Sequence, residues 1–519
     1  MRLLPYDQGD LACTYLVQNF RSFLSPSRII WPLSKYERDH FRDICHYLST
    51  WCIEVAPSAG NKARSEKFLL LDYVFDSYII GPTVTVIYPK KTQSLQFVQM
   101  ASKDSSSSPT ASIIAQSRPN FTPYEDLYRK LHQNPELSLH EHDTAATIAE
   151  WLRSLKDVQV QTDIGGHGVI GIIRNGPGKT VLLRADIDAL PLKEQTGLAY
   201  SSTKRMTDVT DNVEKPVMHA CGHDMHTTSL LAAGELLLSC RDHWKGTVVL
   251  LFQPNEERAG GAQAMVDDGL YDVNKHAVPV PDVVLGSHVM AMRVGKLYTR
   301  RGIFGSAADS FRLTLFGRGG HGSRPHTTVD PVVLASSTVL KLQTIVSRET
   351  NPQEAVVVTV GAIQAGSAEN VISDEAKLLI NTRTFTKESR ERVKASIIRI
   401  ANAESMAAES PKPPLLEATS SFPLLYNEEN ATDIVSHAMA GYFGDEFSPE
   451  GPISMGSEDF GNLADGIPSC FWNYGGIDAE KWDNAERTGR ISDEIGGKFS
   501  SLQNFFHESI MSNEFSRNP

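Results

Sequence analysis

Three apolar runs of strand length, each ending in ionisable side chains, constrain the fold of this chain more than any other feature. They read TVLLRADIDAL, TVVLLFQPNEE and PDVVLGSHV, and they end at Asp186 and Asp188, at Glu256 and Glu257, and at His288. Near-continuous apolar strands separated by helical stretches are typical of a buried, mostly parallel sheet, which holds ligands beyond the carboxyl ends of its strands. We therefore predict that these acidic and histidine side chains converge.

The order of predicted elements changes in the second half of the chain. There it becomes strand (311–316), helix (330–348), strand (355–363), strand (377–385) and helix (387–407), which is the order of a split βαβ sandwich. A chain of 519 residues is too long for one core. We predict an α/β fold with a mostly parallel-sheet catalytic domain (120–301 and 416–519) and an inserted α+β, ferredoxin-like lid domain (302–415).

Residues 1–119 show no comparable pattern. Their short apolar runs have no strong period, and the Ser-rich stretch that begins at Met100 is typical of a flexible linker. We predict an N-terminal extension there, either loosely packed or unstructured, and Met100 is a plausible alternative start.

Charge and cysteine content narrow the class of partner. Asp and Glu number 62 against 50 for Lys and Arg, which argues against binding nucleic acid or an anionic membrane by bulk charge and favours a small-molecule substrate. Six cysteines do not form a disulfide framework in so long a chain, and the first residues lack a signal-peptide pattern, so we predict a cytoplasmic protein. The most apolar early stretch, 68–88, carries two aspartates, a glycine and a proline, so no membrane span is predicted.

The densest cluster of metal-ligand residue types is MHACGHDMH, from Met218 to His226, just before a predicted helix. A single histidine is more often a core or capping residue, but thiolate, imidazole and carboxylate groups together suit a divalent metal such as zinc. A cysteine nucleophile at Cys221 is the alternative, and it would leave the histidines and the strand-end carboxylates unexplained.

The adjacent carboxylates Glu256 and Glu257 point to the same metal. Two such close charges are costly to bury without a compensating cation. With a metal present, one can coordinate while its neighbour acts as general base toward a water whose pKa the metal lowers to about 7. The alternative is an exposed acidic turn.

Eight motifs in order between residues 120 and 474 resemble the amidohydrolase branch of the aminoacylase and carboxypeptidase superfamily, which includes hippurate hydrolases and plant auxin-conjugate hydrolases. They read LHQNPELSLHE, RADIDALP, MHACGHDMH, FQPNEE followed by GGA, GSHV, GRGGHGSRPH, AENVISDEA with TR, and GSEDF.

The resemblance implies a role for each matching position. It makes Cys221, His223, Glu257 and His288 ligands of a centre that holds two divalent ions (zinc, manganese or cobalt), Glu256 the general base, and Asp186 a residue that orients the ligands by hydrogen bonds. It also implies a homodimer formed through the lid domain. His321 then faces the substrate carbonyl across the dimer interface, while Asn370 and Arg383 hold the substrate, Arg383 by its fork-shaped guanidinium. An exposed strand charge is the alternative for Arg383.

The tail departs from the family pattern, which ends with a histidine ligand in an Asn-His-Ser-like segment. After Gly476 the only histidine is His507, in the unrelated context FFHES. Either His507 substitutes, or the site is incomplete, or the tail is an altered reading of the gene.

Together these observations predict a metal-dependent hydrolase that cleaves the amide bond of N-acyl amino acids, with activity impaired by the tail. The alternatives are a metallocarboxypeptidase or dipeptidase, and a binding protein that retains the cleft without a competent metal site.

Overall fold

The structure is a computed structural model that describes residues 109–489. Most of the predicted N-terminal extension, including Met100, and the tail histidine His507 lie outside the described residues. The last part of the predicted linker is a helix, α3 (Pro109–Ser117), which corrects the linker prediction there. A proline is compatible with the first turn of a helix because its missing N–H would have no partner there.

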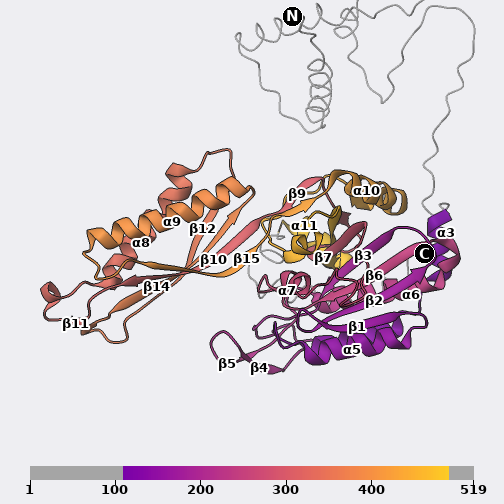
Figure 1. The fold of residues 1–519 in the computed structure, drawn as a ribbon, viewed down its shortest axis with the longest axis horizontal. Helices are drawn as coiled ribbons and strands as arrows, with labels where there is room; N and C mark the ends of the chain where they lie inside the picture. Colours follow the sequence, from indigo (N-terminus) through magenta and orange to yellow (C-terminus); the bar gives the residue numbers. More distant parts are fainter. Residues whose placement is uncertain (1–108, 490–519) are drawn as a thin grey trace, which may run out of the picture. The chain divides into compact units, whose positions relative to one another are not determined.

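The larger domain is built on an eight-stranded sheet with the order β1-β2-β6-β3-β7-β18-β8-β17. Strands β1, β2, β3, β6 and β7 of this sheet are labelled in Figure 1. Its central strands β6, β3, β7 and β18 run parallel, while β1 and β2 add antiparallel strands at one side. This arrangement confirms the predicted α/β class. The strands are β1 (Gln159–Ile164), β2 (Gly168–Asn175), β3 (Thr180–Asp186), β6 (Gly246–Gln253), β7 (Val283–Arg293), β8 (Leu297–Tyr298), β17 (Phe447–Ser448) and β18 (Ser469–Ile477).

Helices cover both faces of this sheet, which explains why its strands are apolar at nearly every position. Along β6, Val248 and Leu250 pack with α4, α5 and α6, whereas Val249 and Leu251 lie in a second core with residues of α7. Successive side chains of a strand point to opposite faces, so both sets must be apolar when both faces are buried. The helices are α4 (Thr122–Gln133), α5 (His142–Ser154), α6 (His223–Ser239), α7 (Gly261–Asp267), α10 (Glu429–Phe443) and α11 (Ala479–Thr488).

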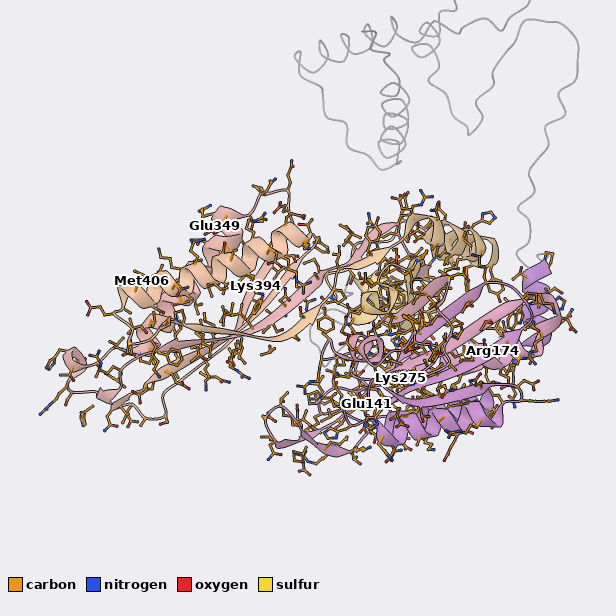
Figure 2. All side chains as sticks on the ribbon, in the orientation of Figure 1. Glu141, Arg174, Lys275, Glu349, Lys394 and Met406 are labelled. Carbon is orange, nitrogen blue, oxygen red and sulfur yellow. The ribbon has the colours of Figure 1, made fainter. Side chains whose placement is uncertain are left out.

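The inserted domain is a four-stranded antiparallel sheet of order β12-β14-β10-β15, with α8 and α9 on one face (Figure 1). Glu349, Lys394 and Met406 mark this helical side in Figure 2. The elements are β10 (Ala307–Phe316), α8 (Pro331–Thr344) with a π-helical turn (Ile345–Glu349), β12 (Val357–Ala365), β14 (Glu375–Thr384), α9 (Lys387–Ala407) and β15 (Leu415–Phe422).

Both predicted boundaries of the inserted domain need correction. The strand that begins at Leu415 pairs with β10 as the fourth strand of the inserted sheet, so the domain extends to Phe422. At the other boundary, β9 (Gly302–Gly305) pairs with β16 (Leu425–Asn427) outside that sheet, so the domain begins at Ala307. Strand pairing over such a long sequence separation leaves no local signal in the chain.

The remaining short elements are β4 (Arg205–Asp208), β5 (Val213–Pro216), β11 (Gly320–His321), β13 (Val371–Ile372) and 3-10 turns at Arg241–His243, Pro325–Thr327, Gly444–Glu446 and Asp459–Ala464. Between residues 109 and 489, no helix is both long and apolar enough to cross a membrane.

Candidate metal centre

The strand ends converge beside the first turn of α6, as the sequence predicts. Ligand atoms of Cys221, His223 and His288 lie within 4.8 Å of one another, and those of His223, Glu256 and Glu257 do so as well. His223 belongs to both groups, so the structure brings all five side chains together.

A glycine allows the chain to turn sharply into this cluster. Gly222, between Cys221 and His223, has φ +78°, and a Cβ there would lie 2.5 Å from Cγ1 of Val289. A side chain at this position would therefore face both backbone strain and a clash. The turn places the cysteine before α6 and the histidine in its first turn.

Backbone carbonyls fix the tautomers of His223 and His288. Nδ1 of His223 lies 2.9 Å from the carbonyl oxygen of Asp188, and Nδ1 of His288 lies 2.5 Å from that of Val289. Because a carbonyl oxygen only accepts, each Nδ1 carries the hydrogen. The Nε2 lone pairs of both rings are left for a metal, which is how metal-binding histidines are usually oriented.

Two buried polar atoms at the centre have no hydrogen-bond partner. They are Nε2 of His223 and Oε1 of Glu257, 3.8 Å apart. Buried polar atoms without partners are rare in folded proteins, and a cation between these two would satisfy both. The residues present therefore fit a divalent metal.

The ionisation of Cys221 and Glu257 also fits a cation. Burial, followed by the neighbouring Glu257 carboxylate, raises the pKa of the Cys221 thiol well above its usual range. Burial likewise raises the pKa of Glu257 to about 7. Both shifts show that negative charge is disfavoured here, and a bound metal ion would reverse them, since a coordinating thiol is deprotonated.

The general-base candidate Glu256 lies in a more acidic part of the cluster. Its carboxylate is within 4.8 Å of those of Glu458 and Asp459. Burial, and then the charge of Glu458, raise the pKa of Glu256 well above its usual value. A carboxyl with a raised pKa holds a proton more readily than a free one.

Asp186, predicted to orient the ligands, contacts the centre through hydrogen bonds. Its Oδ1 lies 2.5 Å from Nδ1 of His226, and Nε2 of His226 accepts from the backbone N–H of Val289 at 2.9 Å. Both ring nitrogens of His226 are thus occupied, so His226 positions the site rather than offering a lone pair to metal. Sequence reasoning did not single it out, although its i, i+3 spacing from His223 puts both on one helix face.

The residues predicted in the inserted domain are divided between its two ends. His321 and Asn370 lie together, because β11 pairs with β13 and Gly322 N–H donates to the Asn370 carbonyl at 2.8 Å. Arg383 lies opposite Ala308 at the start of β10. At about 3.3 Å per residue, β10 separates the two ends by roughly 25 Å. The structure therefore places Arg383, but not His321 or Asn370, at the end of the inserted domain where β10 begins and the domain joins the rest of the chain. We call this end the root of the inserted domain.

Arg383 contacts the segment that precedes Glu458. Its Nη1 donates to the carbonyl of Met455 and to Oγ of Ser457, the latter at 3.2 Å. The side chain is half-buried, and burial lowers the pKa of its guanidinium. The alternative of a fully exposed strand charge does not fit these contacts.

Comparisons with known proteins point to one family. The model for peptidase family M20/M25/M40 matches residues 182–488. A hippurate hydrolase from Campylobacter jejuni is 38% identical over 343 residues, which cover 65% of this chain and 84% of the relative. An IAA-amino acid hydrolase from Arabidopsis thaliana (ILR1-like 2) is 37% identical over 346 residues, 66% of this chain and 74% of the relative. The solved structure of a dinuclear metal-binding M20 peptidase from Bacillus subtilis matches with a TM-score of 0.54 at 27% identity, covering 75% of this chain and 99% of that one.

Proposed function

Because the chain belongs to peptidase family M20/M25/M40, and within it to the amidohydrolase branch, we propose that it hydrolyses the amide bond of N-acyl amino acids with the help of divalent metal ions. The observation that carries the proposal is the pair of buried polar atoms without hydrogen-bond partners, His223 Nε2 and Glu257 Oε1, which lie 3.8 Å apart. The hippurate and IAA-amino acid hydrolases are named for substrates of this class.

In this proposal the metal ligands are Cys221, His223, Glu257 and His288, and the centre takes two ions, either zinc, manganese or cobalt. When bound, divalent ions would polarise the amide carbonyl and lower the pKa of a water molecule to about 7. The carbonyls of Asp188 and Val289 hold the two histidine rings in the tautomer that binding requires.

Glu256 carries the proton chemistry. Its carboxylate accepts a proton from the attacking water and passes it to the amide nitrogen as the acyl–nitrogen bond breaks. A burial-raised pKa lets the residue hold that proton between the two steps. The products are a carboxylic acid and a free amino acid.

The inserted domain supplies the substrate contacts. Arg383 pairs with the α-carboxylate of the amino-acid part, since a guanidinium matches a carboxylate in a two-point contact. His321 and Asn370 lie at the opposite end of β10 and serve the site of a second chain in a homodimer. We retain the prediction of a cytoplasmic protein whose partner is a small molecule.

A substrate screen coupled to metal analysis tests this proposal. Purified full-length protein would be assayed with N-acetyl, benzoyl and indole-acetyl amino acids, with and without a chelator. We expect release of the free amino acid that chelation abolishes and that added metal restores. Activity that survives complete metal removal, or none on any N-acyl amino acid, would contradict it.

Peptide hydrolysis is a second candidate, favoured by the solved structure of an M20 peptidase with a similar fold. A metallocarboxypeptidase or dipeptidase would use the same centre but would cleave peptides with a free amino terminus. Faster cleavage of dipeptides than of their N-acyl amino acid counterparts would favour this candidate.

A further inference from the structure

We propose that Glu458 is a positioning residue that links Arg383, at the root of the inserted domain, to the metal centre through the buried side chain of Arg184. The inference deepens the proposed function and rests on it, because Arg383 is assigned there to the substrate carboxylate. The link has a centre and two arms.

Arg184 is the centre of this link. Its side chain is fully buried, and each of its five N–H groups meets an acceptor. Two go to Glu458, at 3.1 Å and 2.8 Å, in a two-point contact. The other three reach Gln253 Oε1 (2.8 Å), Asp186 Oδ2 (2.8 Å) and Asp459 Oδ1 (3.4 Å). A planar group with every donor occupied fixes the relative placement of all these side chains.

One arm runs from Arg184 to the metal centre. Asp186, bound to Arg184 through Oδ2, also contacts His226 at 2.5 Å, and its Oδ2 lies 3.5 Å from Nε2 of His223. Gln253 donates to Asp459 at 2.6 Å and lies three residues before Glu256. Movement of Arg184 would therefore displace both the candidate ligand His223 and the strand end that carries the candidate general base Glu256.

The other arm runs to the inserted domain. Ser306, between β9 and β10, donates its N–H to the carbonyls of Ser454 (3.1 Å) and Gly456 (3.0 Å), and its Oγ to that of Met455 (2.9 Å). Arg383 contacts Met455 and Ser457 in the same segment. The next residue is Glu458, so the segment held by the root of the inserted domain continues directly into the contact with Arg184.

The continuity of these contacts gives the link a function beyond stability. Interiors are close-packed, so a displaced group moves its neighbours rather than being absorbed by empty space. Binding of a substrate carboxylate to Arg383 would thus change the positions of Asp186 and of the strand end near Glu256. The link favours substrates that carry this carboxylate over those that lack it.

A double-mutant cycle tests this link. The variants Glu458→Gln, Arg383→Gln and their combination would be assayed on an N-acetyl amino acid and on its C-terminal amide. We expect each single variant to lose about tenfold in kcat/KM on the acid and far less on the amide. The loss in the double variant should be at least about threefold smaller than the product of the two single-variant losses. Metal content should stay at the wild-type level in all three.

Asp309→Asn is the matched control. Asp309 receives a similar two-point contact from Arg390 (2.7 and 2.6 Å) inside the inserted domain, away from Arg184. Its effect should be additive with Arg383→Gln and equal on both substrates. Ser457→Ala is the second variant, for use if Glu458→Gln misfolds, because it removes a contact of Arg383 without touching Arg184.

The outcomes separate the two proposals. Additive losses, or equal losses on acid and amide, in a wild-type-active enzyme would overturn the link and leave the hydrolase function standing. A wild-type protein that cleaves no N-acyl amino acid would overturn the proposed function and this inference with it. Loss of metal in Glu458→Gln would make the residue a support of the metal site instead.

Discussion

The metal centre and the far end of the inserted domain hold polar side chains in opposite environments. At the strand ends, His223 and Glu256 are buried and surrounded by other functional groups, whereas His321 and Asn370 are exposed. Nδ1 of His321 accepts from Ser323 N–H at 3.1 Å and lies 2.9 Å from Oγ of the same serine. In the proposed mechanism the buried groups act within one chain, whereas the exposed groups act on the site of a second chain.

The largest effect should come from the buried side of this comparison. Glu256→Gln keeps the shape of the side chain but removes its ability to accept a proton, so turnover should fall by roughly 100-fold or more. Metal content should be unchanged because Glu257 remains. Steady-state kinetics with elemental analysis would check both values.

Glu136→Gln is the control for that variant. Glu136 is also a buried glutamate, but its carboxylate accepts from the backbone and side chain of Thr144 at the start of α5. Its loss should lower stability and leave turnover nearly intact. If Glu256→Gln loses metal, the residue is a ligand, and if its turnover is unchanged, it has neither role.

On the exposed side of the comparison, His321 should affect turnover only through the site of a second chain. His321→Ala is expected to lower turnover by about 100-fold, the loss typical of removing one group that stabilises developing charge on the substrate. Mixing this variant with Glu256→Gln should restore about a quarter of wild-type activity, because half of randomly formed dimers then hold one complete site. Activity in the mixture no higher than the sum of the separate variants would show that His321 does not act across an interface.

The sequence predicts the buried side of this comparison well. Apolar strands that stop at Asp186, Glu256 and His288 carry a local signal, because burial on both faces forces the apolar run and the site requires the polar stop. The side chains that reach across the sheet carry no such signal. The contact of Arg184 with Glu458 joins residues 274 positions apart, and the local sequence around either residue does not predict it.

Residues in the inserted domain illustrate a second limit. Local patterns predict the order of the larger elements along the chain, but they do not predict β15, whose burial alternates only weakly. Glu141, labelled in Figure 2, shows a third limit: it precedes α5, where an exposed acid is expected, yet it is fully buried and burial raises its pKa to about 8. Long-range packing decides such cases.

The sequence of the tail predicts a smaller effect, on the metal content of the metal centre. The resemblance implies a further histidine ligand near the end of the chain; if His507 does not replace it, we expect the second ion to be held weakly, with metal content below two per chain and low activity. Metal titration of wild type and His507→Ala would check this. Two tightly bound ions with full activity, both unaffected by His507→Ala, would show that the tail does not impair the site.

The smallest expected effect on activity is at His132, on the buried side, where the predicted change is in stability. His132 lies between Asp224 (2.7 Å) and Glu194 (3.1 Å) with its side chain fully buried. Burial opposes the charged form, but hydrogen bonds to these two carboxylates outweigh it and raise the pKa of His132 to about 9. The raised pKa means that this stabilisation is complete below about pH 6.5 and is lost as pH rises through 9.

The raised pKa of His132, about 9 against the usual 6.5, adds about 3 kcal/mol to the free energy of unfolding, at 1.36 kcal/mol per pKa unit. Apparent melting temperature between pH 6 and pH 10 would measure it, and His132→Gln should flatten the alkaline decline. His142→Gln is the matched control, since the exposed His142 also contacts an aspartate, Asp143, at 3.0 Å. An equal alkaline decline in wild type and His132→Gln would contradict the account.

The central claim is that Cys221 and its neighbours form the metal site, and the absorption spectrum of cobalt-loaded protein tests it most directly. A thiolate bound to cobalt(II) gives a ligand-to-metal charge-transfer band in the near ultraviolet, which histidine and carboxylate ligands do not give. We predict this band in the wild type and in Cys240→Ser, a free cysteine elsewhere in the catalytic domain, and its loss in Cys221→Ser. A band that persists in Cys221→Ser would place the metal elsewhere and contradict the account.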